Sequence, residues 1–404
     1  MPEIILSPDQ EKVRDAIVEF ARGTEPLLTV GGYAGTGKTT VLAEAIKALG
    51  PDRAPIDFCA FSGKAASVMQ AKLITAGVLR PSDYCGTIHG RIYNLVGSKL
   101  KTNIEKTMES NVDAVRTPIK ERLEQTLSFT QNGGKSAGRF MVIDEGSMVS
   151  DEIFADVKKT GMRILLIGDH GQLPPVKSNN HLMKSPMVRL EKIHRQAEGD
   201  PIIRLSMLAR EEGRIPIGNY GDGVDKVRRT GDCSYADRVT RDWMMLCGRN
   251  STRVWWNETL RKRFGFADHD VMVGERVICL KNNKELQIFN GMLGEVRGIQ
   301  QSGAHWYNIA VDMELGPVFN GQVLKHQFGS QSTLYSYPPA GIDEYQVGDL
   351  FDWGWCVTTH KSQGSEWDSV CVIEERFMPS NEDWCRWIYT AVTRARKRLL
   401  VVGS

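Results

Sequence analysis

A glycine-rich stretch that ends in lysine and threonine is the part of this sequence best suited to chemistry on phosphates. Residues 32–39 read GYAGTGKT, which has the G-x-x-x-x-G-K-[ST] spacing of a phosphate-binding loop. Glycines allow backbone N–H groups to surround phosphate oxygens, and the N-terminus of a following helix adds partial positive charge. Lys38 would reach the β- and γ-phosphates of a nucleoside triphosphate. The residues expected to hold the nucleotide here are Gly32, Gly35, Thr36, Gly37, Lys38, Thr39 and Thr40.

Two adjacent carboxylates supply the other half of this chemistry. Asp144 and Glu145 close the run 139–145, which reads RFMVIDE. An aspartate at the end of a buried strand can hold Mg²⁺ together with Thr39, and a neighbouring glutamate can polarise the attacking water. Acidic residues at strand ends are often merely solvated, but together with a phosphate-binding loop they predict an Mg²⁺-dependent NTPase.

Short apolar runs alternate with helical patterns in the first half of the chain. The runs 27–30, 56–61, 140–143 and 164–167 are each followed by Gly, Ser, Asp or Glu, which is typical of buried parallel strands. Repeated strand–helix units predict an α/β fold with a doubly wound parallel sheet. A second set of such runs, at 244–247, 355–358, 370–373 and 399–402, predicts a second α/β domain.

Changes in polarity and in the pattern of apolar runs suggest the domain boundaries. We expect a first domain over residues 1–192, with a polar insertion at 91–137 that holds 8 Lys/Arg and 5 Asp/Glu. The second domain would span 193–404. It would be interrupted at 268–347 by a small β-rich module, because short strands there are joined by Gly and Asn turns.

Composition excludes several classes of protein. The chain has 404 residues, of which 41% are apolar and 25% charged, as in a soluble globular protein of two or three domains. Its net charge of +2 excludes a strongly basic coat or histone-like protein, although it leaves room for a local basic groove.

No signal for a membrane, an export pathway or a metal cluster stands out. No run of about 18 apolar residues predicts a membrane helix, and the N-terminus lacks the pattern of a secretory signal. The 8 cysteines show no C-x-x-C spacing, so we expect neither a zinc site nor a disulfide framework, and a cytoplasmic location fits.

Besides the phosphate-binding loop, eight short motifs follow one another in a fixed order. They read SPDQ at 7–10, FSGKAA at 61–66, TIH at 87–89, DEGSM at 144–148, GDHGQLPPV at 168–176, IHRQ at 193–196, THKSQGSE at 359–366 and YTAVTRAR at 389–396. In this order they resemble the motifs of superfamily 1 helicases, specifically the RecD-like and Dda-like subgroup. The sequence departs from that family at Phe61-Ser62, where Pro-Thr is usual.

The resemblance implies two RecA-like domains with ATP in the cleft between them. The insertion at 91–137 would be a strand-separating pin or wedge, and the β-rich module an SH3-like domain. Gln10 would read adenine, Gln172 would sense the γ-phosphate, and Arg195 and Arg394 would act as arginine fingers. The catalytic set implied is Lys38, Asp144, Glu145, Gln172, Arg195 and Arg394, with Gly364 and Glu366 also at the nucleotide.

The resemblance also implies an ATP-dependent DNA helicase that moves 5′ to 3′ on single-stranded DNA and opens forked duplexes. It would act as a monomer, in replication, recombination or repair, with a single-strand-binding protein or a replisome component as partner. A phage origin would place it in the host cytoplasm. The residues expected at the nucleic acid are Ser62, Gly63, Lys64, Thr87, His89, Pro174, Thr359, His360 and Lys361.

Three alternatives stay open from the residues. The first is a translocase that walks on nucleic acid without separating strands. The second is a nucleotide-switched binding protein with negligible turnover, against which the intact Glu145, Gln172 and Arg394 argue. RNA is a less favoured substrate, because nothing in the sequence recognisably reads a 2′-hydroxyl.

Overall fold

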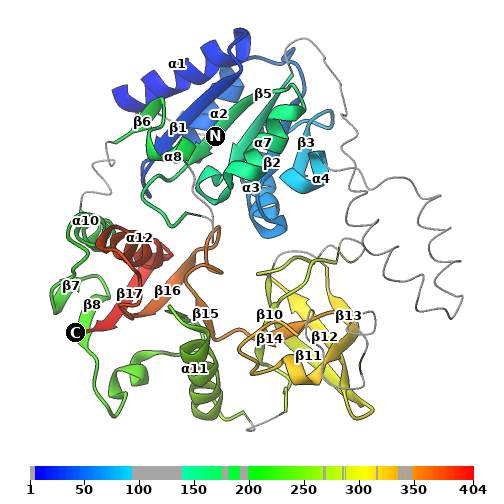
Figure 1. Cartoon of the computed structure of the whole chain (residues 1–404), viewed down its shortest axis with the longest axis vertical. Coiled ribbons are helices and arrows are strands. Elements are labelled where there is room, and N and C mark those ends of the chain that lie inside the picture. Colours follow the sequence, from blue (N-terminus) through cyan, green and yellow to red (C-terminus); the bar gives the residue numbers. More distant parts are fainter. Residues whose placement is uncertain are drawn as a thin grey trace, which may run out of the picture.

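Three β-sheets organise the chain, and Figure 1 shows them as three groups of elements. The structure is a computed structural model that describes residues 5–92, 139–174, 181–191, 199–266, 270–283, 286, 288–314, 317–334, 342 and 348–404. Most of the predicted insertion at 91–137 therefore lies outside the described residues, as does Arg195. Among the described helices, none is long and apolar enough to cross a membrane.

The first sheet is entirely parallel, with the order β3-β2-β4-β5-β1-β6. Successive strand residues face opposite sides: Val142 and Leu165 pack with α1, α2 and α3, whereas Met141 and Leu166 pack with α4 and α7. The sheet is thus covered by helices on both faces, and the predicted α/β parallel-sheet fold is confirmed. Its elements are α1 Pro8–Arg22, β1 Leu27–Gly32, α2 Lys38–Ala48, β2 Ile56–Ala60, α3 Gly63–Thr75, β3 Tyr84–Thr87, α4 Ile88–Ile92, β4 Phe140–Asp144, η1 Gly146–Met148, α7 Asp151–Lys159, β5 Arg163–Gly168, α8 His181–Lys184 and β6 Val188–Leu190.

The second sheet has the order β15-β9-β16-β17-β8-β7 and is parallel except for the β7–β8 pair. Apolar residues of α10 and α12 pack on one face, and those of α11 pack on the other. Sequence reasoning missed β7 and β8, which lie at one edge. The elements are α10 Pro201–Glu212, β7 Gly218–Gly221, β8 Val224–Arg228, η2 Ser234–Arg238, β9 Met244–Cys247, α11 Asn250–Arg263, β15 Cys356–Thr358, β16 Trp367–Ile373, α12 Asn381–Val392 and β17 Ala395–Gly403.

The third sheet is antiparallel, with the order β13-β12-β11-β10-β14, and encloses its own apolar core. Its last strand, β14, pairs with β10 and lies beyond residue 347, so the predicted end of the β-rich module was too early. Buried ion pairs Arg253–Asp352 (2.5 Å) and Arg261–Glu275 (2.6 Å) join this sheet to α11. The elements are β10 Arg276–Cys279, β11 Leu293–Ser302, β12 Trp306–Met313, β13 Phe319–Leu324, η3 Lys325–Gln327 and β14 Phe351–Trp353.

A buried carboxylate on β2 ties together the two described ends of the predicted insertion. Asp57 has no solvent exposure, and it accepts hydrogen bonds from Arg91 Nε (2.6 Å) and from the Arg139 guanidinium. Arg91 lies on α4 and Arg139 directly precedes β4. One side chain thus fixes both points at which the chain leaves and re-enters the first sheet.

Replacing Asp57 with asparagine should lower the free energy of unfolding by about 3 kcal/mol, because two arginines then lose the charge that compensates them. Chemical denaturation at neutral pH measures this. Glu44→Gln is the matched control, since its partner Lys47 is exposed and such pairs contribute at most about 1 kcal/mol. Equal stability losses in the two variants would contradict the assigned role of Asp57.

Candidate active site

The phosphate-binding loop joins β1 to α2, as its sequence predicts. Gly35 and Gly37 have φ angles of 77° and 81°, a left-handed conformation that favours glycine. Gly37 caps α2 without a side-chain hydrogen bond, so N–H groups of the first helical turn are available to an anion. Lys38 Nζ lies over the loop, 2.7 Å from the Gly32 carbonyl oxygen and 3.0 Å from that of Tyr33. The loop therefore has the geometry needed to hold nucleotide phosphates.

Gln10 supports this loop from α1. Its Nε2 donates to the Thr36 carbonyl oxygen (3.0 Å), and its Oε1 accepts from the Ser7 N–H (3.1 Å). A Cβ atom at Gly37 would lie 2.5 Å from Gln10 Nε2, so the amide packs directly against the loop. Both ends of the amide thus contact backbone, while its adenine-reading role stays a prediction.

The two predicted carboxylates stand where β4 ends. Glu145 has a φ angle of 53°, which is rare for a residue with a side chain and is characteristic of functional sites. Its N–H donates to Asp144 Oδ1 (2.9 Å). Burial and the Asp144 carboxylate raise the pKa of Glu145, whereas Arg394 and Lys38 act in the opposite direction. The Glu145 carboxylate therefore interacts with one cation from the first domain, Lys38, and one from the second domain, Arg394.

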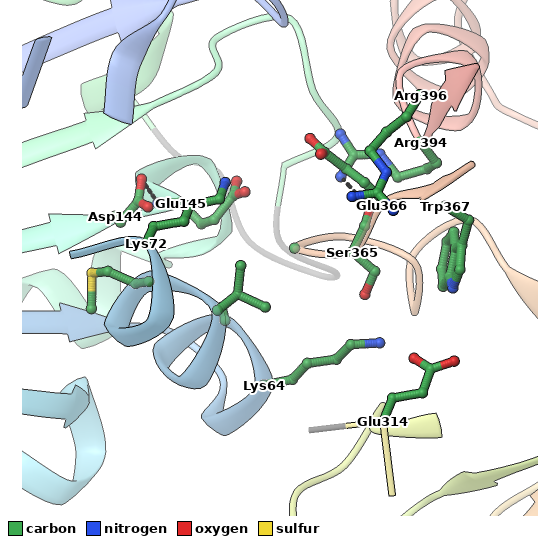
Figure 2. A pocket seen from close by; sticks show the side chains of 14 residues that line it. Lys64, Lys72, Asp144, Glu145, Glu314, Ser365, Glu366, Trp367, Arg394 and Arg396 are labelled. Carbon is green, nitrogen blue, oxygen red and sulfur yellow. Dashed lines mark hydrogen bonds between the residues drawn. The ribbon is translucent and has the colours of Figure 1, made fainter. Parts of the chain in front are cut away.

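A pocket of about 320 Å³ separates these carboxylates from the second domain (Figure 2). Arg394 is buried beside it, two residues beyond the end of α12, and donates to Thr390 O (3.0 Å), Ser365 O (3.1 Å) and Thr393 Oγ1 (3.1 Å). These bonds fix the guanidinium in place before a ligand arrives. The polar residues that line the pocket are Lys64, Lys72, Asp144, Glu145, Glu314, Ser365, Glu366, Arg394 and Arg396, and Gly364 lies among them.

Gln172 lies on the loop that follows β5. The side chain is buried, and its Nε2 donates to Asp169 Oδ2 (3.4 Å). Its Oε1 and the Ser147 hydroxyl have no hydrogen-bond partner among the described residues. Both residues, with Pro174, line a cavity of about 10 Å³, which has room for a single water molecule. This arrangement suits a side chain that contacts water or phosphate oxygen.

The other cations in and after α12 form ion pairs with carboxylates of the protein. Arg386 pairs with Glu382, Arg396 and Lys397 pair with Asp368, and Arg398 pairs with Asp242. Of these, Arg396 alone also lines the 320 Å³ pocket among the described residues. Arg394 is thus the buried cation of the second domain that lines the pocket with Glu145 and acts on its carboxylate.

One part of the predicted nucleic-acid surface is in contact with the antiparallel sheet. Ser62 caps α3 by accepting from the Ala65 N–H (3.1 Å). Gly63 packs so closely on Phe289 that a Cβ atom would lie 2.2 Å from its ring. Lys64 is buried, its Nζ donates to the Gly291 carbonyl oxygen (2.9 Å), and burial lowers its pKa to about 8. In this arrangement Lys64, on α3 of the first domain, is bonded to the segment between β10 and β11 of the antiparallel sheet.

The other predicted nucleic-acid residues differ in accessibility. Thr87 ends β3, and His89 packs against the Phe61 ring. Thr359 is fully buried and donates to the Cys247 carbonyl oxygen (3.3 Å), so its hydroxyl is engaged inside the second domain.

Burial lowers the pKa of His360, and it lowers that of Lys361 to about 8. Burial thus favours the neutral form of His360, whose flat ring suits stacking more than phosphate pairing.

Sequence reasoning missed the side chains that connect the two domains. Gln363 Nε2 donates to the Leu173 carbonyl oxygen (2.9 Å), and Tyr389 contacts both Asp169 and the phosphate-binding loop. Gln363, Tyr389 and Asp169 each lie inside one of the eight motifs. Their position within a motif is therefore the feature of the sequence that could have indicated a functional role. Which of these side chains meet depends on how the two domains pack against each other.

Two family models match the chain. A model described as an AAA domain matches residues 6–234, and one described as a UvrD-like helicase C-terminal domain matches residues 354–402. Over 293 residues the chain is 28% identical to the ATP-dependent RecD2 DNA helicase of Deinococcus radiodurans. The chain belongs to the AAA-domain family, and the relatives it matches include RecD-like proteins. The relative from Deinococcus radiodurans is named an ATP-dependent DNA helicase.

The relatives differ from this chain in length. The RecD2 alignment covers 65% of this chain and 36% of RecD2, so the chain spans about a third of that protein. The RecD subunit of the RecBCD enzyme of Mycobacterium tuberculosis is 22% identical, over 98% of this chain and 69% of that protein. A crystal structure of Pif1 helicase from Bacteroides, in complex with ADP-AlF3 and ssDNA, is 19% identical with a TM-score of 0.55, covering 99% of this chain and 92% of that one. This last similarity supports the fold.

Proposed function

We propose that the chain is an ATP-dependent DNA helicase that moves along single-stranded DNA from 5′ to 3′ and separates duplex strands. The observation that carries this proposal is the pocket shared by two domains, in which Asp144 and Glu145 face Arg394 (Figure 2). When catalytic groups come from two domains, each cycle of binding and hydrolysis can change the distance between those domains. Alternating grip on a strand would turn that change into directed movement.

Each group has a role that its position supports. Lys38 and the N–H groups at the start of α2 bind phosphate oxygens, and Glu145 polarises the attacking water. Arg394 offers a rigid fork of donors to the charge that develops on the transferred phosphoryl group. Gln172 follows β5, the strand between β4 and β1, and its amide oxygen has no hydrogen-bond partner among the described residues.

Thr39 and Asp144 would hold Mg²⁺, since both supply oxygen ligands, one from the first turn of α2 and one from the end of β4. Mg²⁺ is commonly held in nucleotide sites by one or two carboxylates together with phosphate oxygens. Bound there, it would neutralise charge on the β- and γ-phosphates.

DNA is the substrate that the relatives support. RecD2 is named a DNA helicase, and the Pif1 structure contains ssDNA. We expect phosphate contacts and stacking on flat groups such as His89 and His360 to dominate binding. Sequence specificity should then be low and binding should weaken steeply with salt. The predicted wedge at 91–137 lies almost wholly outside the described residues, so strand separation stays a proposal, as do 5′-to-3′ polarity and action as a monomer.

Unwinding of forked duplexes that carry a single 5′ or a single 3′ tail tests the proposal. We expect ATP-dependent strand separation from the 5′-tailed substrate alone. Unwinding from the 3′ tail alone would contradict the polarity. ATP hydrolysis and movement along DNA without strand separation, measured as streptavidin displacement from biotinylated DNA, would instead indicate a translocase.

A further inference from the structure

Hydrogen bonds between the two parallel-sheet domains converge on the loop 169–174, which carries Gln172. The Leu173 N–H donates to Thr390 Oγ1 (3.0 Å), and the Leu173 carbonyl oxygen accepts from Gln363 Nε2 (2.9 Å). Asp169, at the start of the loop, accepts from the Tyr389 hydroxyl (2.7 Å). The second domain therefore holds this loop of the first domain at three points.

Tyr389 differs from the other two contacts because it also reaches the phosphate-binding loop. It lies on α12 and is almost completely buried. Its hydroxyl accepts from the Ala34 N–H (2.8 Å) while it donates to Asp169 Oδ2. Burial and the Asp169 carboxylate raise the pKa of Tyr389 well above its usual value, so the hydroxyl stays a donor. A single oxygen atom thus connects two nucleotide-site loops of one domain to the other domain.

Asp169 connects Tyr389 to Gln172, because its carboxylate accepts hydrogen bonds from both side chains. The carboxylate is fully buried and accepts from the Gly171 N–H (2.9 Å) as well as from Gln172 Nε2 (3.4 Å). Holding the amide by its nitrogen leaves Oε1 as the end that meets water or phosphate. Gly171 leaves little room for a side chain here: a Cβ atom would lie 3.0 Å from the Tyr389 ring and 3.1 Å from the Tyr33 ring, so both rings would have to shift by a few tenths of an ångström.

We propose that Tyr389 is a positioning residue for ATP hydrolysis, which orients Gln172 through Asp169 when the phosphate-binding loop and the second domain are in contact. This inference rests on the proposed function. Separation of the domains withdraws the hydroxyl from Ala34 and Asp169 together, so Gln172 loses its fixed orientation. Hydrolysis is thereby confined to the arrangement in which the two domains touch.

Tyr389→Phe tests this by removing one oxygen atom and keeping the ring. We expect kcat for DNA-stimulated ATP hydrolysis to fall about tenfold or more, the effect of a hydrogen bond to a charged group. KM for ATP should change less than about twofold, because phosphate binding is left intact. Tyr235→Phe is the matched control: it makes the same exchange at a buried tyrosine of the second domain, whose hydroxyl meets Cys233 Sγ (3.5 Å), and should change neither constant.

A double-mutant cycle with Gln172→Ala separates positioning from a general structural effect. If Tyr389 acts through Gln172, Tyr389→Phe should slow the Gln172→Ala enzyme little or not at all. Independent, multiplicative losses would overturn the proposal. If thermal unfolding shows that Tyr389→Phe does not fold, Asp169→Asn replaces it, with the same expected loss and the same cycle.

Two results would overturn different claims. A Tyr389→Phe enzyme with wild-type kcat, measured beside a wild type that DNA stimulates, overturns the positioning role alone. A wild type that hydrolyses no ATP overturns the proposed function and the positioning role with it.

Discussion

Lys38→Ala should abolish ATP turnover, with a loss of about 10³-fold or more, while single-stranded DNA binding is retained. Lys38 is the cation that the phosphate-binding loop holds over its own carbonyl oxygens, at 2.7 and 3.0 Å, in the place where phosphate oxygens would compete for it. Preorganised donors of this kind contribute mainly to the transition state, so their removal lowers kcat steeply. Steady-state hydrolysis and fluorescence anisotropy of a labelled oligonucleotide measure the two properties.

Lys47→Ala is the control for that experiment. It makes the same substitution on the same helix, but Lys47 lies in the last turn of α2 and pairs with Glu44 at 2.7 Å. Its turnover should equal that of the wild type. Persistent hydrolysis by Lys38→Ala would mean that the phosphate-binding loop has been wrongly assigned.

Arg394→Ala should lower kcat by about 10³-fold and leave KM for ATP within a few fold. Arginine fingers contribute about 10³–10⁵ to turnover in related NTPases, because the charge they meet exists mainly in the transition state. Arg394 enters the pocket from the second domain, opposite Glu145, so the loss would also show that catalysis needs both domains.

Two further variants sharpen that result. Arg394→Lys keeps the charge but lacks the planar fork, so it should recover only a small part of the activity. Arg398→Ala, which removes an exposed arginine bonded to Asp242 and Ser369, should leave kcat unchanged. Arg394 also satisfies the Thr390 and Ser365 carbonyl oxygens, so thermal unfolding must show that Arg394→Ala is folded. A rise in KM for ATP with kcat unchanged would instead indicate ground-state binding.

Local motifs account for the parts of the site that the sequence predicts. The phosphate-binding loop and the carboxylates at the end of β4 depend on spacing within a few residues, and both lie where predicted. The strand β8 was missed because Asp225 and Lys226 interrupt its apolar pattern. Both are buried, and pairing with Arg238 and Glu374 makes their burial possible.

Contacts between distant segments could not be read from the sequence. Tyr389 meets Ala34 across 355 positions, and Lys64 meets Gly291 across 227 positions. Spacing carries no information about such pairs, since they depend on how whole domains pack. For the same reason a resemblance could suggest Lys64 for DNA but could not reveal its contact with the antiparallel sheet.

The most direct test of the central claim is ATP hydrolysis by the wild-type chain with and without single-stranded DNA, in the presence of Mg²⁺. Two domains that share one nucleotide site and one strand should hydrolyse ATP much faster when DNA is bound. We predict strong stimulation by DNA that declines as salt is raised. Hydrolysis that is unchanged by DNA at any salt concentration would contradict a helicase that couples ATP to movement along the strand.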